Sequence, residues 1–376
     1  MNAPLSTELL ANPLLEDWQT PFGLPPFERI KPEHFQPAFE VALATHRAEI
    51  DAIANDAAAP GFENTIAAFD RSGRLAARIG LLFDNLTSSA TSPALQAVER
   101  DMAQPLAAHA NAIYLDAALF ARIDRVHATR HALGLNDEQV RLVERLHLDF
   151  IRAGARLADA ARARYATVTE RLAELCTVFG QNVLADESGY QLVLRNEADL
   201  AGLPPFVRDA AQSAARERGI AEGCVITLSR SLIVPFLTYS TRRDLRESAF
   251  KAWAARGEGV QDAAHDNRGL IRDIMTLRHE QATLLGYASY ADYALDDTMA
   301  RTPAAVRALL DQAWAPAKAR RADEERLGAV LAPAGLARPV DDRPRERDLR
   351  AEVPPRMPRD EEVLLTEELA EERQGR

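Results

Sequence analysis

The sequence predicts a mostly α-helical fold, a large helical domain with two short β-strands. No proline occurs between Pro105 and Pro204, a gap of 98 residues. Long helices require such a gap, because an interior proline removes a hydrogen bond and clashes with the preceding turn. Within the gap, apolar residues recur at three- and four-residue steps, which places them along one helical face. Strand signal is limited to two short stretches: Tyr190, Leu192 and Leu194 alternate with Gln191 and Val193, and a second β-prone run begins at Val225.

Capping residues and apolar spacing place the helices of the N-terminal half. Pro32 suits a first helical turn. Asn136 suits an N-cap, because acids follow it where the helix dipole favours negative charge. The predicted helices and their inward residues are Pro32 to Ala54 (Phe35, Phe39, Leu43, Ile50), Thr65 to Leu86 (Ile66, Phe69, Ile79, Leu82, Phe83), one after Asn136 that loosens at Gly154 (Val140, Val143, Leu146, Phe150), and one through 164–183 (Tyr165, Val168, Leu172, Leu175, Phe179, Val183).

The two strands and three further helices are predicted beyond residue 183. Helix starts are marked by proline in a first turn or by a capping threonine, and helix ends by glycine. The predicted strands are Tyr190 to Leu194 and Val225 to Leu228, and the helices are Pro205 to Arg218, a helix capped by Thr241 that runs through Trp253 and ends near Gly257, and one opened by Thr302 and Pro303 with Val306, Leu309, Leu310 and Trp314 inside.

Composition changes at Pro333. Residues 333–376 hold nine Arg, four Asp, eight Glu and six Pro, with no Lys and no aromatic residue. A segment so charged and so poor in large apolar groups cannot bury enough surface to offset the entropy of ordering. We therefore predict two parts, a helical portion over residues 1–332 and a disordered charged tail over residues 333–376.

Charge and cysteine content restrict the partners and the compartment. The net charge of −11 argues against nucleic acid as a partner, because phosphate binding requires a basic face. Cys176 and Cys224 form no disulfide scaffold, which favours a reducing compartment. No basic residue precedes Arg29, and no uncharged apolar run is long enough to cross a bilayer. We therefore expect a cytoplasmic protein without a membrane anchor.

Zinc-hydrolase spacing is absent from the sequence. A catalytic zinc needs three protein ligands, and an HExxH helix supplies two of them together with the general base. The nearest fragment, His279-Glu280-Gln281-Ala282-Thr283, has threonine at the second histidine position. His127 and His131 are four residues apart, yet Ala128 stands where the base would be. We interpret both fragments as ordinary polar residues, with an independent metal site at His127 and His131 as the minor alternative.

Other chemical signatures also fail. Gly257-Glu258-Gly259 lacks a third glycine and a preceding strand, so it is interpreted as a loop. Neither a GxSxG nor a GxxxxGK[ST] motif occurs. Asp292, Asp296 and Asp297 are interpreted as helix-end residues rather than a catalytic pair. The residues alone therefore predict no catalytic, cofactor-binding or metal-binding residues.

Several short motifs follow one another along the chain. They are Leu24-Pro25-Pro26-Phe27-Glu28-Arg29-Ile30-Lys31-Pro32-Glu33-His34-Phe35-Gln36-Pro37-Ala38-Phe39, Phe62-Glu63-Asn64-Thr65-Ile66, Asn85-Leu86-Thr87-Ser88-Ser89-Ala90, Arg152-Ala153-Gly154-Ala155, Gln181-Asn182-Val183-Leu184-Ala185-Asp186, Pro235-Phe236-Leu237-Thr238-Tyr239, Leu284-Leu285-Gly286-Tyr287 and Asp296-Asp297-Thr298-Met299-Ala300. In this order they resemble the thimet-oligopeptidase-like zinc peptidases, in particular the bacterial peptidyl-dipeptidase and oligopeptidase A branch. The resemblance extends over roughly residues 12 to 330.

The resemblance implies a helical wall of a channel that admits short peptides. Members of the family are nearly twice as long, and their zinc helix and oxyanion-supporting residues lie in the second half of the chain. None of those positions has a counterpart here, so no catalytic or metal role is carried over. The similarity is lost near Leu331, where the charged tail begins, and we expect a gene truncated before HExxH with an out-of-frame or rearranged end.

Two hypotheses of function result. In the first, the chain is the N-terminal portion of a zinc-dependent oligopeptidase and is inactive alone, although zinc serves the intact family. In the second, it is a non-catalytic peptide-binding or assembly module, or half of a split enzyme whose catalytic half is encoded separately.

Overall fold

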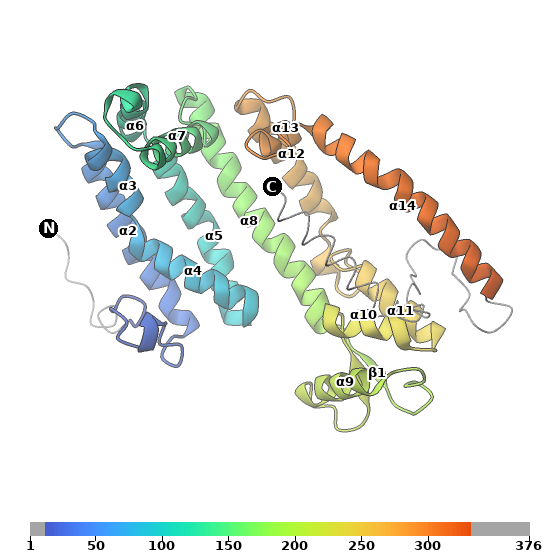
Figure 1. The fold of residues 1–376 in the computed structure, drawn as a ribbon. Helices are drawn as coiled ribbons and strands as arrows, with labels where there is room; N and C mark the ends of the chain where they lie inside the picture. Colours follow the sequence, from blue (N-terminus) through green and yellow to red (C-terminus); the bar gives the residue numbers. More distant parts are fainter. Residues whose placement is uncertain (1–11, 332–376) are drawn as a thin grey trace, which may run out of the picture. The chain divides into compact units, whose positions relative to one another are not determined.

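The computed structural model describes residues 12–331 and confirms a mostly α-helical fold with two short strands (Figure 1). The chain divides into two compact units: Met1–Gln181 with Asn267–Thr302, and Asn182–Asp266 with Pro303–Arg376. The tail predicted for residues 333–376 lies outside the described residues. In the part of the chain from residue 12 to residue 331, no helix is long and apolar enough to cross a membrane.

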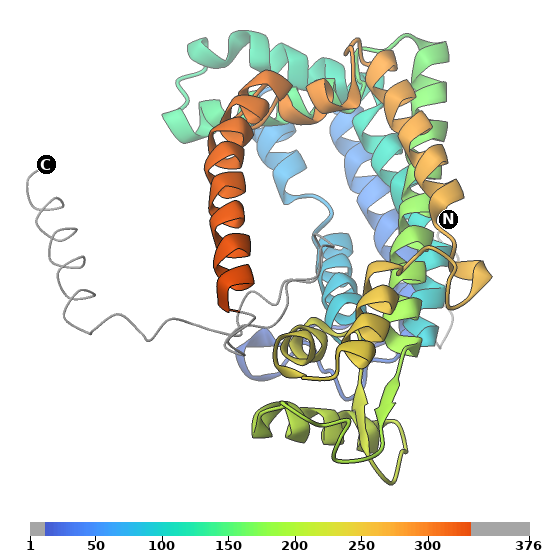
Figure 2. The same ribbon diagram turned by 90° about the vertical axis from the view of Figure 1, so that its right-hand side faces the viewer.

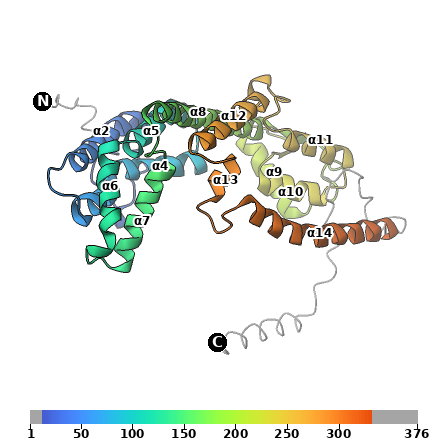
Figure 3. The same ribbon diagram turned by 90° about the horizontal axis from the view of Figure 1, so that it is seen from above.

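The first unit is built from helices alone. They are α2 (Phe35–Ala54), α3 (Ala68–Arg71), α4 (Arg74–Ser89), α5 (Pro93–Tyr114), α6 (Ala117–Thr129), α7 (Asp137–Arg152), most of α8 (Asp159–Gly189), α12 (Arg268–Leu284) and α13 (Tyr290–Leu295). Short 3₁₀ turns cover Pro21–Gly23, Pro32–His34 and Arg130–Ala132, and a π-helical turn covers Phe62–Ala67. Figure 3 shows α6 and α7 side by side.

Two apolar clusters hold the first unit together. In one, the ring centroid of Phe83 lies 5.0 Å from that of Phe35 and 5.5 Å from that of Phe39. Phe83 and Phe39 meet edge-on. In the other, fully buried Phe150 packs beside Ile66 and Ile123. Tilted and edge-on aromatic pairs are favoured over face-to-face pairs by the ring quadrupole. The helical spacing of Phe35, Phe39 and Phe150 in the sequence therefore marks residues that are buried.

The second unit contains the two strands. β1 (Leu192–Leu194) and β2 (Cys224–Ile226) pair antiparallel, with Val193 opposite Val225. α9 (Pro205–Glu217) connects them and packs along β2 (Figure 2). α10 (Arg230–Tyr239), α11 (Arg243–Ala254), a 3₁₀ turn at Ala263–His265 and α14 (Pro303–Leu331) complete the unit. Val225, Ile226 and Phe236 are fully buried in its core.

Several predicted boundaries need correction. The helix predicted from Thr65 to Leu86 is interrupted at Ser72 and Gly73, because Gly73 adopts a left-handed conformation with φ of 69°. Thr241 does not cap α11; its N–H and hydroxyl donate instead to the carbonyl of Ala201. Asn136 does cap α7, since its side chain accepts from the N–H of Gln139 at 2.8 Å. α7 ends at Arg152, shortly before Gly154.

The largest correction concerns the apolar face of α14. Its spacing predicted Val306, Leu309, Leu310 and Trp314 inside, yet Leu309, Leu310 and Trp314 expose 68%, 60% and 63% of their surface. Val306 is half-buried. Because large apolar surfaces left in water mark interaction sites, this face is relevant to function.

Candidate functional site

The fragment nearest to a zinc motif lies on α12 and is engaged by α8. Glu280 accepts two hydrogen bonds from Arg164, from Nε at 2.5 Å and from a terminal nitrogen at 2.8 Å. This guanidinium lowers the pKa of the Glu280 carboxyl. Nε2 of buried Gln281 lies 3.4 Å from the hydroxyl of Tyr165. The polar groups of this fragment therefore join two helices, and Glu280 is not free to act as a general base.

The structure does not bring His127 and His131 together. His127 lies on α6, and its ring stacks on that of His147 from α7 with centroids 3.7 Å apart. His131 is exposed in the 3₁₀ turn that follows α6. Nε2 of His147 lies 2.8 Å from Oδ1 of Asp124. Burial, followed by the charge of His147, lowers the pKa of His127. Sequence reasoning missed His147, because its partner lies 20 positions earlier on another helix.

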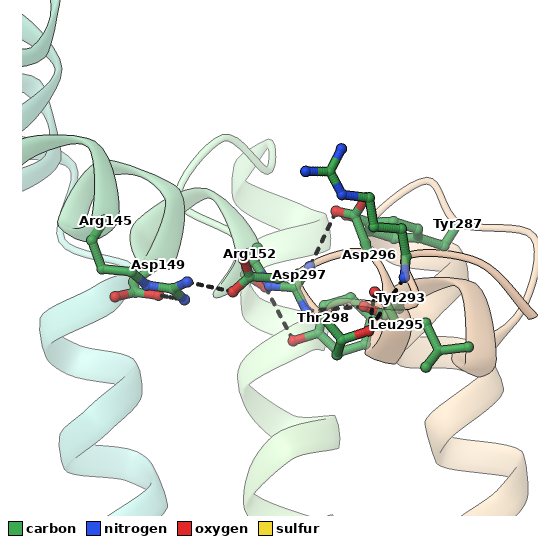
Figure 4. A network of polar contacts seen from close by, with 10 residues as sticks. Arg145, Asp149, Arg152, Tyr287, Tyr293, Leu295, Asp296, Asp297 and Thr298 are labelled. Carbon is green, nitrogen blue, oxygen red and sulfur yellow. Dashed lines mark hydrogen bonds and ion pairs between the residues drawn. The ribbon is translucent and has the colours of Figure 1, made fainter. Parts of the chain in front are cut away.

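The acids after α13 take part in a polar network with α7 (Figure 4). Arg145 bridges two carboxylates: it pairs with Asp149 and, at 2.5 Å, with Asp297. Arg152 pairs with Asp296 at 3.2 Å. The Arg145 guanidinium lowers the pKa of the Asp297 carboxyl. Each of these acids therefore has a cationic partner, which does not fit a catalytic carboxylate pair.

Tyrosines complete the same network. The hydroxyl of Tyr287 donates to Asp296 at 2.8 Å, and the guanidinium of Arg152 lies 4.8 Å from the ring centroid of Tyr293. Arg152 also donates to the Tyr293 carbonyl at 2.9 Å. Asp292 has a different role, since it accepts from the Ser289 hydroxyl at the start of α13. The network holds the segment after α13 against α7.

A buried carboxylate that the motif search did not single out lies on α8. Asp186 exposes 1% of its surface. Its Oδ2 accepts from the N–H of Gly257 at 2.8 Å, and its Oδ1 lies 2.6 Å from Nδ1 of His265. Since a carboxylate only accepts, Nδ1 of His265 carries a proton and donates it to Asp186. In the sequence, Asp186 attracts attention only as the last residue of the motif that begins at Gln181. No local pattern links it to His265, which lies 79 positions away.

The remaining candidates contribute no chemistry. Gly257-Glu258-Gly259 lies in the loop after α11, where Gly257 and Gly259 both have positive φ. Cys176 is exposed on α8, whereas Cys224 is buried in β2. Burial raises the pKa of the Cys224 thiol. A thiol with a raised pKa is a weak nucleophile at neutral pH.

The described residues do not fit a catalytic zinc. Such a site needs three protein ligands and one open position. From residue 12 to residue 331, no group of three or more His, Cys, Asp or Glu side chains is placed to hold a metal ion. His127 and His147 instead stack on one another, and His147 and His265 each contact an acid. No step of chemistry through a metal is derived from this chain.

Comparison with known proteins shows which family this chain is similar to. Residues 236–327 match Peptidase family M3. The chain is 38% identical over 314 residues to the dipeptidyl carboxypeptidase of Salmonella typhimurium, a match that covers 84% of this chain and 46% of the relative. It is 37% identical over 313 residues to the dipeptidyl carboxypeptidase of Escherichia coli, covering 83% and 46%. It is 30% identical over 296 residues to the Escherichia coli oligopeptidase A, covering 78% and 43%. The chain thus spans about half the length of the curated relatives it matches.

Proposed function

Since this chain is a relative of the thimet-oligopeptidase-like metallopeptidases of Peptidase family M3, we propose that it is the N-terminal, channel-wall portion of a zinc-dependent oligopeptidase that hydrolyses short peptides. One observation carries the proposal: 38% identity to a dipeptidyl carboxypeptidase over 84% of the chain. The proposal includes a helical portion over residues 1–332, a separate charged segment over residues 333–376 and a cytoplasmic location.

By itself the chain is proposed to be inactive. Support comes from the sequence, which contains no HExxH, and from the described residues, among which no three potential ligands converge. In a complete enzyme the zinc would activate water for attack on the peptide bond. This chain would then supply the wall that admits and orients the peptide.

An activity assay tests this proposal. The purified chain is incubated with zinc and a short internally quenched peptide, and cleavage is followed with and without a chelator. The same assay is repeated after co-expression with a polypeptide from the same family that carries HExxH. Cleavage that the chelator abolishes is expected in the second case only. Chelator-sensitive turnover by the chain alone would contradict the proposal, as would an inactive co-purified complex.

A second function, assembly with a separate catalytic half, is favoured by the face of α14. Val306, Leu310 and Trp314 are each four residues apart, so they share one side of the helix. The exposure of Leu310 and Trp314 leaves this side in water within the described part of the chain. Burying one such side chain contributes about 1.5–3 kcal/mol. A partner that carries the rest of a family M3 peptidase is proposed to cover this face.

The matched substitutions Leu310→Glu and Ala308→Glu test the assembly function. Both positions are exposed on α14, and Ala308 lies on the opposite side of the helix. We expect Leu310→Glu to reduce co-purification with the HExxH-bearing polypeptide, and Ala308→Glu to leave it unchanged. Trp314 emission should shift to shorter wavelength in the complex. Equal effects of the two substitutions would contradict this role of the face.

A further inference from the structure

Two histidines and a serine form a chain of contacts inside the first unit, and none of the three belongs to the polar groups of the candidate site. Nε2 of His109 on α5 lies 3.0 Å from Nδ1 of His46 on α2. Nε2 of His46 lies 3.3 Å from the hydroxyl of Ser72, in the turn between α3 and α4. The Ser72 hydroxyl also lies 2.7 Å from the carbonyl of Phe69. These side-chain contacts therefore connect α5, α2 and the turn before α4.

The contacts determine where the protons lie. A carbonyl only accepts, so Ser72 donates its hydroxyl proton to Phe69 and offers a lone pair to His46. His46 therefore carries its proton on Nε2 and donates it to Ser72. Its Nδ1 is left as an acceptor, and Nε2 of His109 must be the donor to it. Nδ1 of His109 takes no part in this chain of contacts.

The two histidines can share the first added proton. A proton added to Nδ1 of His109 leaves every contact of the chain in place. A proton added to Nδ1 of His46 is also accommodated, because neutral His109 can carry its own proton on Nδ1 and accept at Nε2. When both rings are protonated, two N–H donors and two positive charges face each other at 3.0 Å. This contact is repulsive, so the second proton breaks the link between α2 and α5.

We propose that His46, His109 and Ser72 form an acid-sensitive latch that holds α5 and the turn before α4 against α2 and opens when both histidine rings are protonated. Gly73 allows this geometry, because a Cβ atom there would lie 2.6 Å from Cε1 of His46. The latch is independent of the proposed peptidase function.

The charges around the latch agree with an opening at acidic pH. Burial lowers the pKa of His46, and the nearby Glu49 carboxylate opposes this effect only in part. Glu49 is itself held by the N–H of Gly73 at 2.7 Å. Burial, then His46, then Arg47 lower the pKa of His109. Because burial lowers the folded-state pKa of both rings, the latch is closed at neutral pH and opens as the pH falls and the second proton binds.

A pH titration of the full chain labelled with ¹⁵N in its histidine rings tests the latch without any substitution. We expect His46 to carry its proton on Nε2 at neutral pH, and we expect the rings of His46 and His109 to take up their protons in two coupled steps. Amide hydrogen exchange in α5, corrected for its intrinsic pH dependence, should stay slow after the first step and accelerate with the second.

The variant Ser72→Ala provides a second test, because it removes the acceptor of the Nε2 proton and leaves both histidines in place. We expect its Nδ1 and Nε2 tautomers of His46 to become mixed, with the α5 amides less protected at neutral pH. The latch is overturned if the rings of His46 and His109 titrate independently of each other, or if exchange in α5 does not change when the second proton binds.

Discussion

Removal of the buried carboxylate of Asp186 is expected to destabilise the second unit strongly. Asp186→Ala leaves the N–H of Gly257 and the Nδ1–H of His265 without their acceptor in a site where Asp186 is 1% exposed. A hydrogen bond to a charged group contributes about 1.5–3 kcal/mol. Two such bonds therefore predict a loss of about 3–6 kcal/mol, close to the range of about 3–5 kcal/mol for breaking a buried pair from one side. Asp186→Asn keeps an acceptor oxygen and should lose about half as much.

Urea unfolding followed by Trp253 fluorescence measures this loss, because Trp253 packs against the core of the second unit. Phenylalanine in place of Trp18 and Trp314 removes the other two tryptophans. Asp209→Ala, at an exposed position on α9, is the matched control and should change stability by less than about 0.5 kcal/mol. If Asp186→Ala lowers the free energy of unfolding no more than this control does, the two hydrogen bonds do not stabilise the unit. Strict additivity with His265→Ala would also refute the reasoning.

Four further substitutions have expected outcomes in urea unfolding, here followed by circular dichroism because only Gly202 lies in the second unit. Gly202→Ala should cost more than about 1 kcal/mol, since Gly202 has a φ of 84° and a Cβ there would meet the carbonyl oxygen of Tyr239. Gly180→Ala lies in the middle of α8 with open space around it, so it should instead raise the free energy of unfolding by about 0.5–1 kcal/mol. A loss of stability at Gly180, or no change at Gly202, would contradict this reasoning from backbone conformation. Phe150→Ala should cost about 3–5 kcal/mol, because Phe150 is fully buried, and a cost below 1.5 kcal/mol would show that the site collapses around the cavity. Arg145→Met should lower the free energy of unfolding by about 1 kcal/mol, because the half-exposed guanidinium pairs with two carboxylates. High salt should reduce this difference between the variant and the unchanged protein.

Local patterns in the sequence predict the long helices well, because their determinants lie within each helix. The Asn136 cap and the apolar spacing of Val143 and Phe150 suffice for α7, and both are as predicted in the structure. The break before α4 depends instead on a contact from outside the segment. The ring of His46, 27 positions before Gly73, occupies the space that a Cβ at Gly73 would need. Local periodicity contains no information about such a neighbour.

The face of α14 shows a second reason why prediction fails. Periodicity identifies which side chains share a side of a helix, and it did so for Leu310 and Trp314. It cannot identify what covers that side, and both residues are exposed among the described parts of the chain. The polar clusters have the same dependence on tertiary structure: Asp186 and His265 are brought together by the fold, so a search for spaced motifs could not find them.

The contacts of Figure 4 depend on arginine rather than lysine, which determines how they respond to alkali. Of the 45 basic residues in the chain only Lys31, Lys251 and Lys318 are lysines. A guanidinium keeps its proton above pH 12, so hydroxide does not discharge these pairs. The phenols respond instead, and burial raises the pKa of Tyr165 to about 12. In alkaline solution, the ultraviolet absorbance of tyrosinate should therefore rise while the arginine pairs beside it remain charged.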